Sequence, residues 1–210
     1  MTGMSMSQTW YAAAPGYLGM WMAMMVPMML PSLVPVLWRY RQSVRGADGI
    51  HLHGLTGLVA GGYFVVWAAF GAAAYTAGAG LMAVGMRWGA VARWLSVAAG
   101  VMLIVAGGMQ LTSWKARQLA RCREWSGCCS LPAQTAVGAW WHGLRLGVRC
   151  SLCCAGLMLA LLAVGMMDLM AAAAVTLVIS AERLGPAPVR VARLAGAAIV
   201  VAGVVTLARI

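Results

Sequence analysis

Long apolar runs, close to the length that crosses a membrane, recur along this chain of 210 residues and are separated by short basic connectors. Hydrophobic residues make up 63% of the chain and charged residues only 9%, whereas a soluble domain carries roughly 25% charged residues. In lipid every backbone polar group must be bonded internally, so runs of this kind are expected to form helices. The sequence therefore predicts an all-α, polytopic transmembrane helix bundle in one integral membrane domain, residues 1–210.

The apolar runs predict about six helices. A helix needs ~20 apolar residues to cross the hydrocarbon core, with a range of about 17–25. The fifth run is short for a full crossing, so five spans plus a partial one remain an alternative. The predicted spans are about 18–38, 55–80, 94–112, 148–166, 169–182 and 193–208.

Basic residues predict the orientation of the bundle. Most of them follow the first span, or lie between the third and fourth or between the fifth and sixth. The positive-inside rule makes that side cytoplasmic and places the N- and C-termini outside. The connector 113–147 then lies in the cytoplasm, with a basic helix over Leu111–Trp125 on the membrane surface. The net charge of +11 is thus explained by topology and by anionic lipid headgroups, and nucleic acid is not an expected partner.

The first predicted span is unusually rich in methionine and proline. Six of the chain's 17 methionines lie between Met20 and Met29. Thioether sulfur fills irregular gaps in a core, and it is also a soft ligand for Cu(I). At about 100° per residue, Met20, Met24 and Met28 form one stripe, which is expected to turn inward because three prolines on it free backbone carbonyls. The alternative is that methionine packs a kinked helix. The prolines are Pro27, Pro31 and Pro35.

The fourth predicted span begins with several thiols on one helical face. Cys150, Cys153, Cys154 and Met158 occupy positions i, i+3, i+4 and i+8. Thiolates together with thioethers suit Cu(I), and thiolates alone also suit zinc. Cys122 lies among basic residues of the connector, which favour its thiolate form. The structural alternative is that these are small apolar residues at a helix interface.

The few acidic residues form no catalytic arrangement. Glu182 ends the fifth span beside Arg183, and pairing of Glu182 with a cytoplasmic arginine is the simplest expectation. Asp168 lies at the outer junction of the fourth and fifth spans, where an ionisable group near hydrocarbon is a functional candidate. Because the sequence has no Ser-His-Asp set, no carboxylate pair and no phosphate-binding loop, it predicts no catalytic residue and no organic cofactor site. An enzyme is therefore less expected than a binding protein.

Several segments, taken in order, also resemble a known family. They are Trp21–Met29, Gly62–Trp67, Ala106–Lys115, Cys122-Arg123, Cys150–Met158 with its three cysteines, and Glu182-Arg183. Nearly the whole chain is similar to a bacterial family of predicted metal-binding integral membrane proteins, domain-of-unknown-function family 2182. The resemblance implies a metal-binding role in the bacterial cytoplasmic (inner) membrane.

Residues and resemblance together give the functional hypothesis of soft-metal handling, tolerance or cuproprotein maturation. A copper ion is the expected metal, with zinc less favoured. The expected partners are the lipid bilayer and metal-handling proteins of the membrane or periplasm. The alternatives are a membrane thiol oxidoreductase that uses the cysteines at 150–154 with a quinone, and a structural subunit of a membrane assembly. The predicted metal ligands are Met20, Met24, Met28, Cys150, Cys153, Cys154, Met158 and Cys122.

Overall fold

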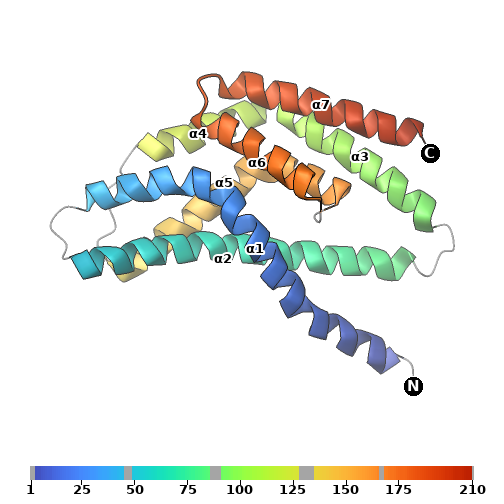
Figure 1. The fold of residues 1–210 in the computed structure, drawn as a ribbon, viewed down its shortest axis with the longest axis horizontal. Coiled ribbons are helices and arrows are strands. Elements are labelled where there is room, and N and C mark those ends of the chain that lie inside the picture. The colour runs from blue at the N-terminus through green and yellow to red at the C-terminus, as the bar shows by residue number, and fades with distance from the viewer. Residues whose placement is uncertain (1–2, 45–48, 86–90, 128–134, 166–167, 210) are drawn as a thin grey trace.

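The apolar sequence is helical throughout almost all of the residues that the computed structural model describes, 3–44, 49–85, 91–127, 135–165 and 168–209 (Figure 1). No strand occurs among these residues, so the predicted all-α bundle is confirmed. The vicinal pair Cys128–Cys129 of the connector lies outside the described residues. The helices are α1 (Gly3–Ser43), α2 (Gly49–Gly85), α3 (Val91–Leu111), α4 (Ser113–Gly127), α5 (Ala136–Val164), α6 (Leu169–Leu184) and α7 (Pro188–Ala208).

The described helices differ in whether they can cross a membrane. Within the described residues, four stretches are long and apolar enough, and α3 with α4 passes the same test as a pair bent by 62°. By contrast α6, the predicted short fifth span, has 16 residues, which at 1.5 Å per residue is about 24 Å, against ~30 Å of hydrocarbon. The four stretches are Ala13–Ser43, Ile50–Gly80, Ala136–Val164 and Pro188–Ala208.

The predicted connector is largely helical and packed onto the bundle. The basic helix expected at Leu111–Trp125 is α4, Ser113–Gly127, and it packs against α5 rather than lying apart from the other helices. Leu119 and Lys115 on its inner face are buried. The helix α5 begins at Ala136 instead of near residue 148, because Thr135 caps its first turn by accepting a hydrogen bond from the backbone N–H of Gly138.

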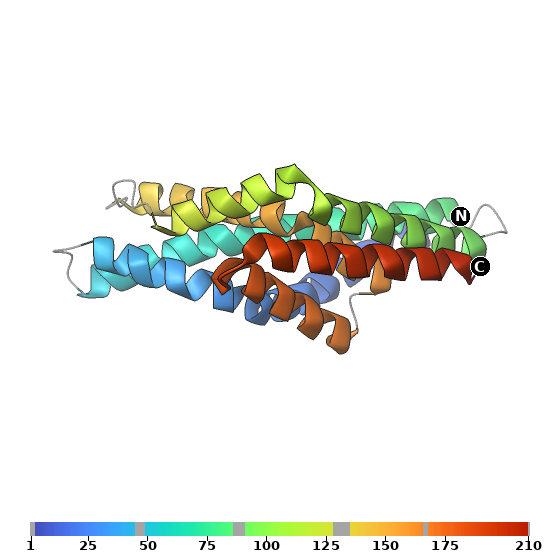
Figure 2. The same ribbon diagram turned by 90° about the horizontal axis from the view of Figure 1, so that it is seen from above.

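The two described ends of the chain lie at the same end of the elongated molecule (Figures 1 and 2). The C-terminal end of α1 and the N-terminal end of α2 lie at the opposite end, as do the end of α4 and the start of α5 (Figure 1). The predicted basic connectors therefore gather mainly away from the termini. This agrees with a topology that puts both termini on one side; the orientation to a membrane stays a prediction.

Glycines allow α2 and α5 to approach closely. A Cβ atom at Gly147 would meet the carbonyl oxygen of Tyr63 at 2.9 Å, and one at Gly143 would overlap the carbonyl of Val59. Across the same contact, a Cβ at Gly62 would lie 2.7 Å from the Trp140 carbonyl oxygen. Helices in lipid associate through such small residues, because close backbones gain van der Waals contact.

A second glycine contact joins α3 to α7, which run side by side in both views (Figures 1 and 2). A Cβ at Gly107 would lie 2.7 Å from the Gly196 carbonyl oxygen, and one at Gly203 would lie 2.9 Å from that of Gly100. These two glycine contacts hold the bundle around the buried side chains of α1, α5 and α6.

Replacing Gly143 with alanine is expected to destabilise the bundle by about 1–3 kcal/mol, because the added methyl forces α2 and α5 apart. Gly57→Ala is the matched control, since a Cβ at Gly57 on α2 meets nothing within 4 Å. Thermal unfolding of the full chain in detergent, followed by circular dichroism, measures both. Equal midpoints for the two variants would show that the α2–α5 contact does not need glycine.

Candidate metal centre

The helix α5 places its three cysteines in the centre of the bundle. Cys150, Cys153 and Cys154 are each no more than 2% exposed, and all three are free thiols. Their spacing keeps them within one turn and a little more of the helix, on its inner face. The structure therefore has these cysteines on one face of α5, as predicted, and Met158 is buried one turn further along.

Cys150 is the residue on which side chains from three other helices converge. The Tyr63 hydroxyl of α2 and the Cys150 sulfur are 2.9 Å apart, a distance made possible by the neighbouring Gly147 contact. The Met29 sulfur of α1 lies 4.0 Å from the Cys150 sulfur. From α6, Arg183 donates a hydrogen bond from its guanidinium to the same sulfur at 2.9 Å.

Arg183 connects two of the thiols. The nitrogen that donates to Cys150 also lies 3.9 Å from the Cys154 sulfur. A guanidinium keeps its positive charge in proteins, and a buried charge is costly unless it is paired. The arrangement therefore places one positive charge within reach of the sulfur atoms of both Cys150 and Cys154.

Contacts between thiols continue from this pair towards α4. The thiol of Cys154 interacts with those of Cys150 and Cys153, its neighbours on the same turn of α5. Cys122 of α4 packs against Leu119 and Cys153, and its thiol interacts with that of Cys153. The Cys122 thiol also contacts the carbonyl oxygen of Arg149 on α5 at 3.7 Å, across 27 residues of sequence. The fold thus brings the predicted ligand Cys122 next to the cysteines of α5.

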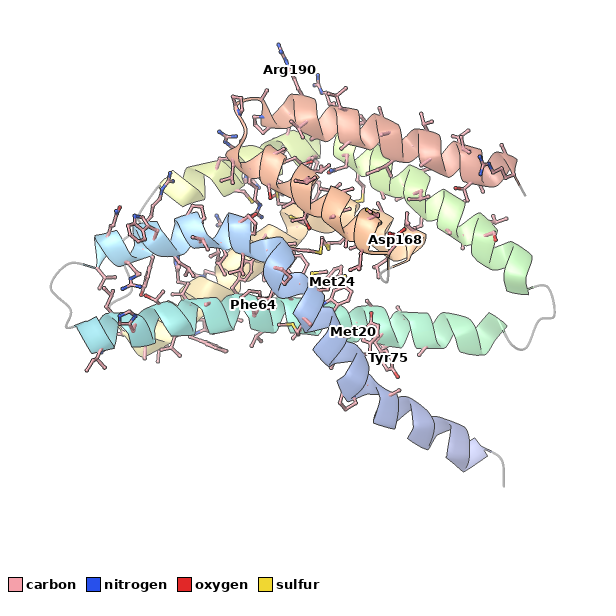
Figure 3. All side chains as sticks on the ribbon, viewed as in Figure 1. Met20, Met24, Phe64, Tyr75, Asp168 and Arg190 are labelled. Atoms are coloured by element: carbon pink, nitrogen blue, oxygen red, sulfur yellow. The ribbon has the colours of Figure 1, made fainter. Side chains whose placement is uncertain are left out.

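The methionines of α1 divide between its inner and outer faces. Met25 and Met29 are fully buried and Met28 is 4% exposed, so these three belong to the core that contains Cys150 and Met158. Met24 is half-buried against this core, and Met20 is 41% exposed. Both lie on the part of α1 that crosses α2 (Figure 3). The structure therefore brings Met28 of the predicted stripe to the core, but not Met20.

The inner face of α1 differs from the one that its prolines suggested. Pro27 and Pro31 are exposed, so the expectation that the proline face turns inward is wrong. Trp21 sets the inner face instead: its indole N–H donates to the Trp67 carbonyl at 3.0 Å, and its ring lies over Gly71, where a Cβ would be 2.7 Å away. Met25, Met28 and Met29 follow Trp21 at helical spacing and so point inward with it.

A buried polar network lies beside the thiols. The Lys115 ammonium of α4 lies 2.7 Å from Glu182 Oε2 of α6, and Gln110 of α3 donates to Glu182 Oε1 at 2.9 Å. The ammonium also donates to the Cys153 carbonyl at 2.6 Å, so four helices meet here. The expected pairing of Glu182 with an arginine is wrong, because Arg183 next to it points around α6 to the cysteines.

The other candidate among the acidic residues has a structural role. Asp168 caps α6, since its carboxylate accepts hydrogen bonds from the backbone N–H groups of Met170 and Ala171 (Figure 3). Such a cap satisfies backbone donors at the start of a helix.

The sequence predictions missed the residues that complete the centre: Tyr63, Met29, Arg183, Lys115 and Gln110. All five lie in segments that carried the family resemblance. In the described part of the chain, no three Cys, His, Asp or Glu side chains converge as ready-made metal ligands. A soft metal held here would therefore draw on methionine as well as cysteine.

Comparison with known protein families finds a match over most of the chain. A family model described as PpoB2, copper chaperone, matches residues 18–206. No curated protein and no solved structure matches the chain.

Replacing Glu182 with leucine is expected to cost about 3–5 kcal/mol of unfolding free energy, because the Lys115 ammonium is left buried without its anion. The double variant Lys115→Met with Glu182→Leu removes both charges and should recover most of that loss. Arg117→Gln on the exposed face of α4 is the control, expected within about 0.5 kcal/mol of wild type. Thermal unfolding in detergent compares them; a double variant as unstable as the single one would contradict this account of the pair.

Proposed function

The chain belongs to the PpoB2 family of copper chaperones, and we propose that it carries Cu(I) within the cytoplasmic membrane on sulfur ligands centred on Cys150 and Cys154. The observation that carries this proposal is the convergence of the two thiols and the Met29 thioether beside one half-buried arginine.

The spacing of the sulfur atoms suits a shared metal ion. Zinc–sulfur bonds are about 2.3 Å long, so a metal with bonds of that length bridges two sulfur atoms up to about 4.6 Å apart. The 4.0 Å between the Cys150 and Met29 sulfurs lies within this limit. Thiolate and thioether ligands together select Cu(I) over harder ions.

Electrostatics supports the same site. Cu(I) bound by two thiolates has a net charge of −1, which would be costly in an apolar interior without a counter-charge. The Arg183 guanidinium is placed to supply that charge to both thiols. Loss of the two thiol protons accompanies binding, so affinity is expected to rise with pH while the thiols titrate.

In this proposal, the remaining predicted ligands extend the copper path on either side of the centre. Met28 and Met158 are buried in the same core, Met24 is half-buried against it and Met20 is exposed. We propose that Cu(I) meets these thioethers before it reaches the thiols. Cys153 and Cys122 follow it towards α4 and the basic connectors. The affinity for Cu(I) is expected to rise from the thioethers to the thiols. Both ligands offer a soft sulfur atom, but a thiolate also carries a negative charge.

The membrane location rests on the long apolar helices and on the basic residues near one end of the bundle. In the bilayer such a chaperone would exchange Cu(I) with metal-handling proteins of the membrane or periplasm. A role in copper tolerance or cuproprotein maturation follows from that exchange.

Titration of the purified full chain with Cu(I) against a chromophoric Cu(I) chelator tests the site. Cys150→Ser with Cys154→Ser should abolish tight stoichiometric binding, whereas Met20→Leu, at the exposed thioether, should leave the centre's affinity unchanged. Met29→Leu should weaken binding and keep the stoichiometry. Unchanged binding in the double serine variant would contradict the proposed centre.

Two replacements of Arg183 test whether its positive charge or its packing supports Cu(I) binding. Arg183→Gln is expected to weaken Cu(I) binding by about 10–100-fold, the usual cost of losing a group that supports a metal ligand. Arg183→Lys retains the positive charge and should recover part of the affinity. The same chelator titration measures both variants, and equal affinities for glutamine and lysine would show that the charge of Arg183 does not matter.

A further inference from the structure

A cavity of about 240 Å³ lies between α1, α4 and α6, with Arg183 in its lining. A single water needs roughly 10–15 Å³ by the same measure, so the space is large enough for a small molecule. Its lining includes Ser32, Arg39, Cys122, Arg123 and Arg183. Arg39 and Arg123 are exposed, so the cavity reaches the surface.

Two polar atoms buried at this cavity have no hydrogen-bond partner among the described residues. They are the Ser32 hydroxyl oxygen and Nε of Arg183. Ser32 is 5% exposed, and buried polar groups in native proteins are nearly always bonded. The terminal nitrogen of Arg183 reaches the thiols, and its Nε–H has no hydrogen-bond partner among the described residues. Both groups can donate to an oxygen atom of a ligand in the cavity.

The charge of the lining selects an anion. Three arginines border the cavity and none of the lining residues is acidic. Arg123 also donates to the Gly185 carbonyl at 2.7 Å, which fixes its guanidinium at the edge. Guanidinium groups match the planar geometry of a carboxylate.

The cavity also touches the end of the thiol chain. Cys122 is in its lining, and Cys122 packs against Cys153, the neighbour of Cys154 on α5. A molecule bound here would therefore meet the sulfur path at its last thiol, on the predicted cytoplasmic side.

We propose that this cavity binds a carboxylate-bearing small thiol as the carrier that exchanges Cu(I) with Cys122. The carboxylate accepts hydrogen bonds from the Ser32 hydroxyl and Arg183 Nε–H, and the exposed arginines attract it to the opening. When the carrier is the donor, its sulfur–copper bond breaks as a bond from copper to the Cys122 sulfur forms. The Cys122 proton passes to the leaving carrier thiolate, and no electron is transferred. The exchange rests on the proposed Cu(I) function; the anion site does not.

The transfer rate from two Cu(I) donors tests the proposal on the full chain in detergent. The donors are the Cu(I) complex of glutathione, which has carboxylates, and that of dithiothreitol, which has none. Ser32→Ala with Arg123→Gln should slow transfer from the glutathione complex about tenfold, the loss expected for a hydrogen bond to a charged group. Transfer from dithiothreitol should be unchanged. Arg117→Gln, the same charge change on α4 outside the lining, is the control.

S-methylglutathione, which keeps the carboxylates and cannot bind copper through a thiol, tests the anion site separately by calorimetry. Saturable binding to wild type, weakened in the Ser32→Ala, Arg123→Gln variant, would support the cavity site. If wild type binds S-methylglutathione but not Cu(I), the proposed copper function is wrong and the anion site stands. No binding of S-methylglutathione, or equal slowing of transfer from both donors, would overturn the proposal.

Discussion

The contact between the Arg183 guanidinium and the Cys150 sulfur, at 2.9 Å, is the interaction on which the candidate centre depends. It places a permanent positive charge among buried thiols, where such a charge is stable only with a negative partner. The same guanidinium is within 3.9 Å of Cys154 and borders the cavity with its Nε. One side chain of α6 thus joins the thiols, the proposed metal charge and the proposed carrier.

The rest of the bundle holds this contact in place. The buried Lys115–Glu182 pair ties α4 to α6 directly beside Arg183, and the Lys115 ammonium also fixes the Cys153 carbonyl of α5. On the opposite side, glycines bring α2 close enough for Tyr63 to reach Cys150. Because desolvation offsets much of the energy that a buried ion pair gains, we interpret these polar contacts as positioning the thiols.

The sequence was sufficient for the all-α bundle, because apolar runs in lipid have few other solutions. It also predicted the common face of Cys150, Cys153 and Cys154, which depends only on helical periodicity. It failed for α1, where the large Trp21 ring and its bond to the Trp67 carbonyl decide which methionines turn inward. The partners of Glu182 and Arg183 could not be predicted either. Adjacent residues on a helix point in different directions, and the packing of the helices decides which neighbour each of them meets.

The ligand set of the bound metal tests the central claim most directly. X-ray absorption at the copper edge, on the full chain loaded with Cu(I), reports which atoms surround the metal. The account predicts a first shell of sulfur atoms alone in wild type, and loss of that shell when Cys150 and Cys154 are both serine. Nitrogen or oxygen ligands in wild type, or an unchanged sulfur shell in the serine variant, would contradict it.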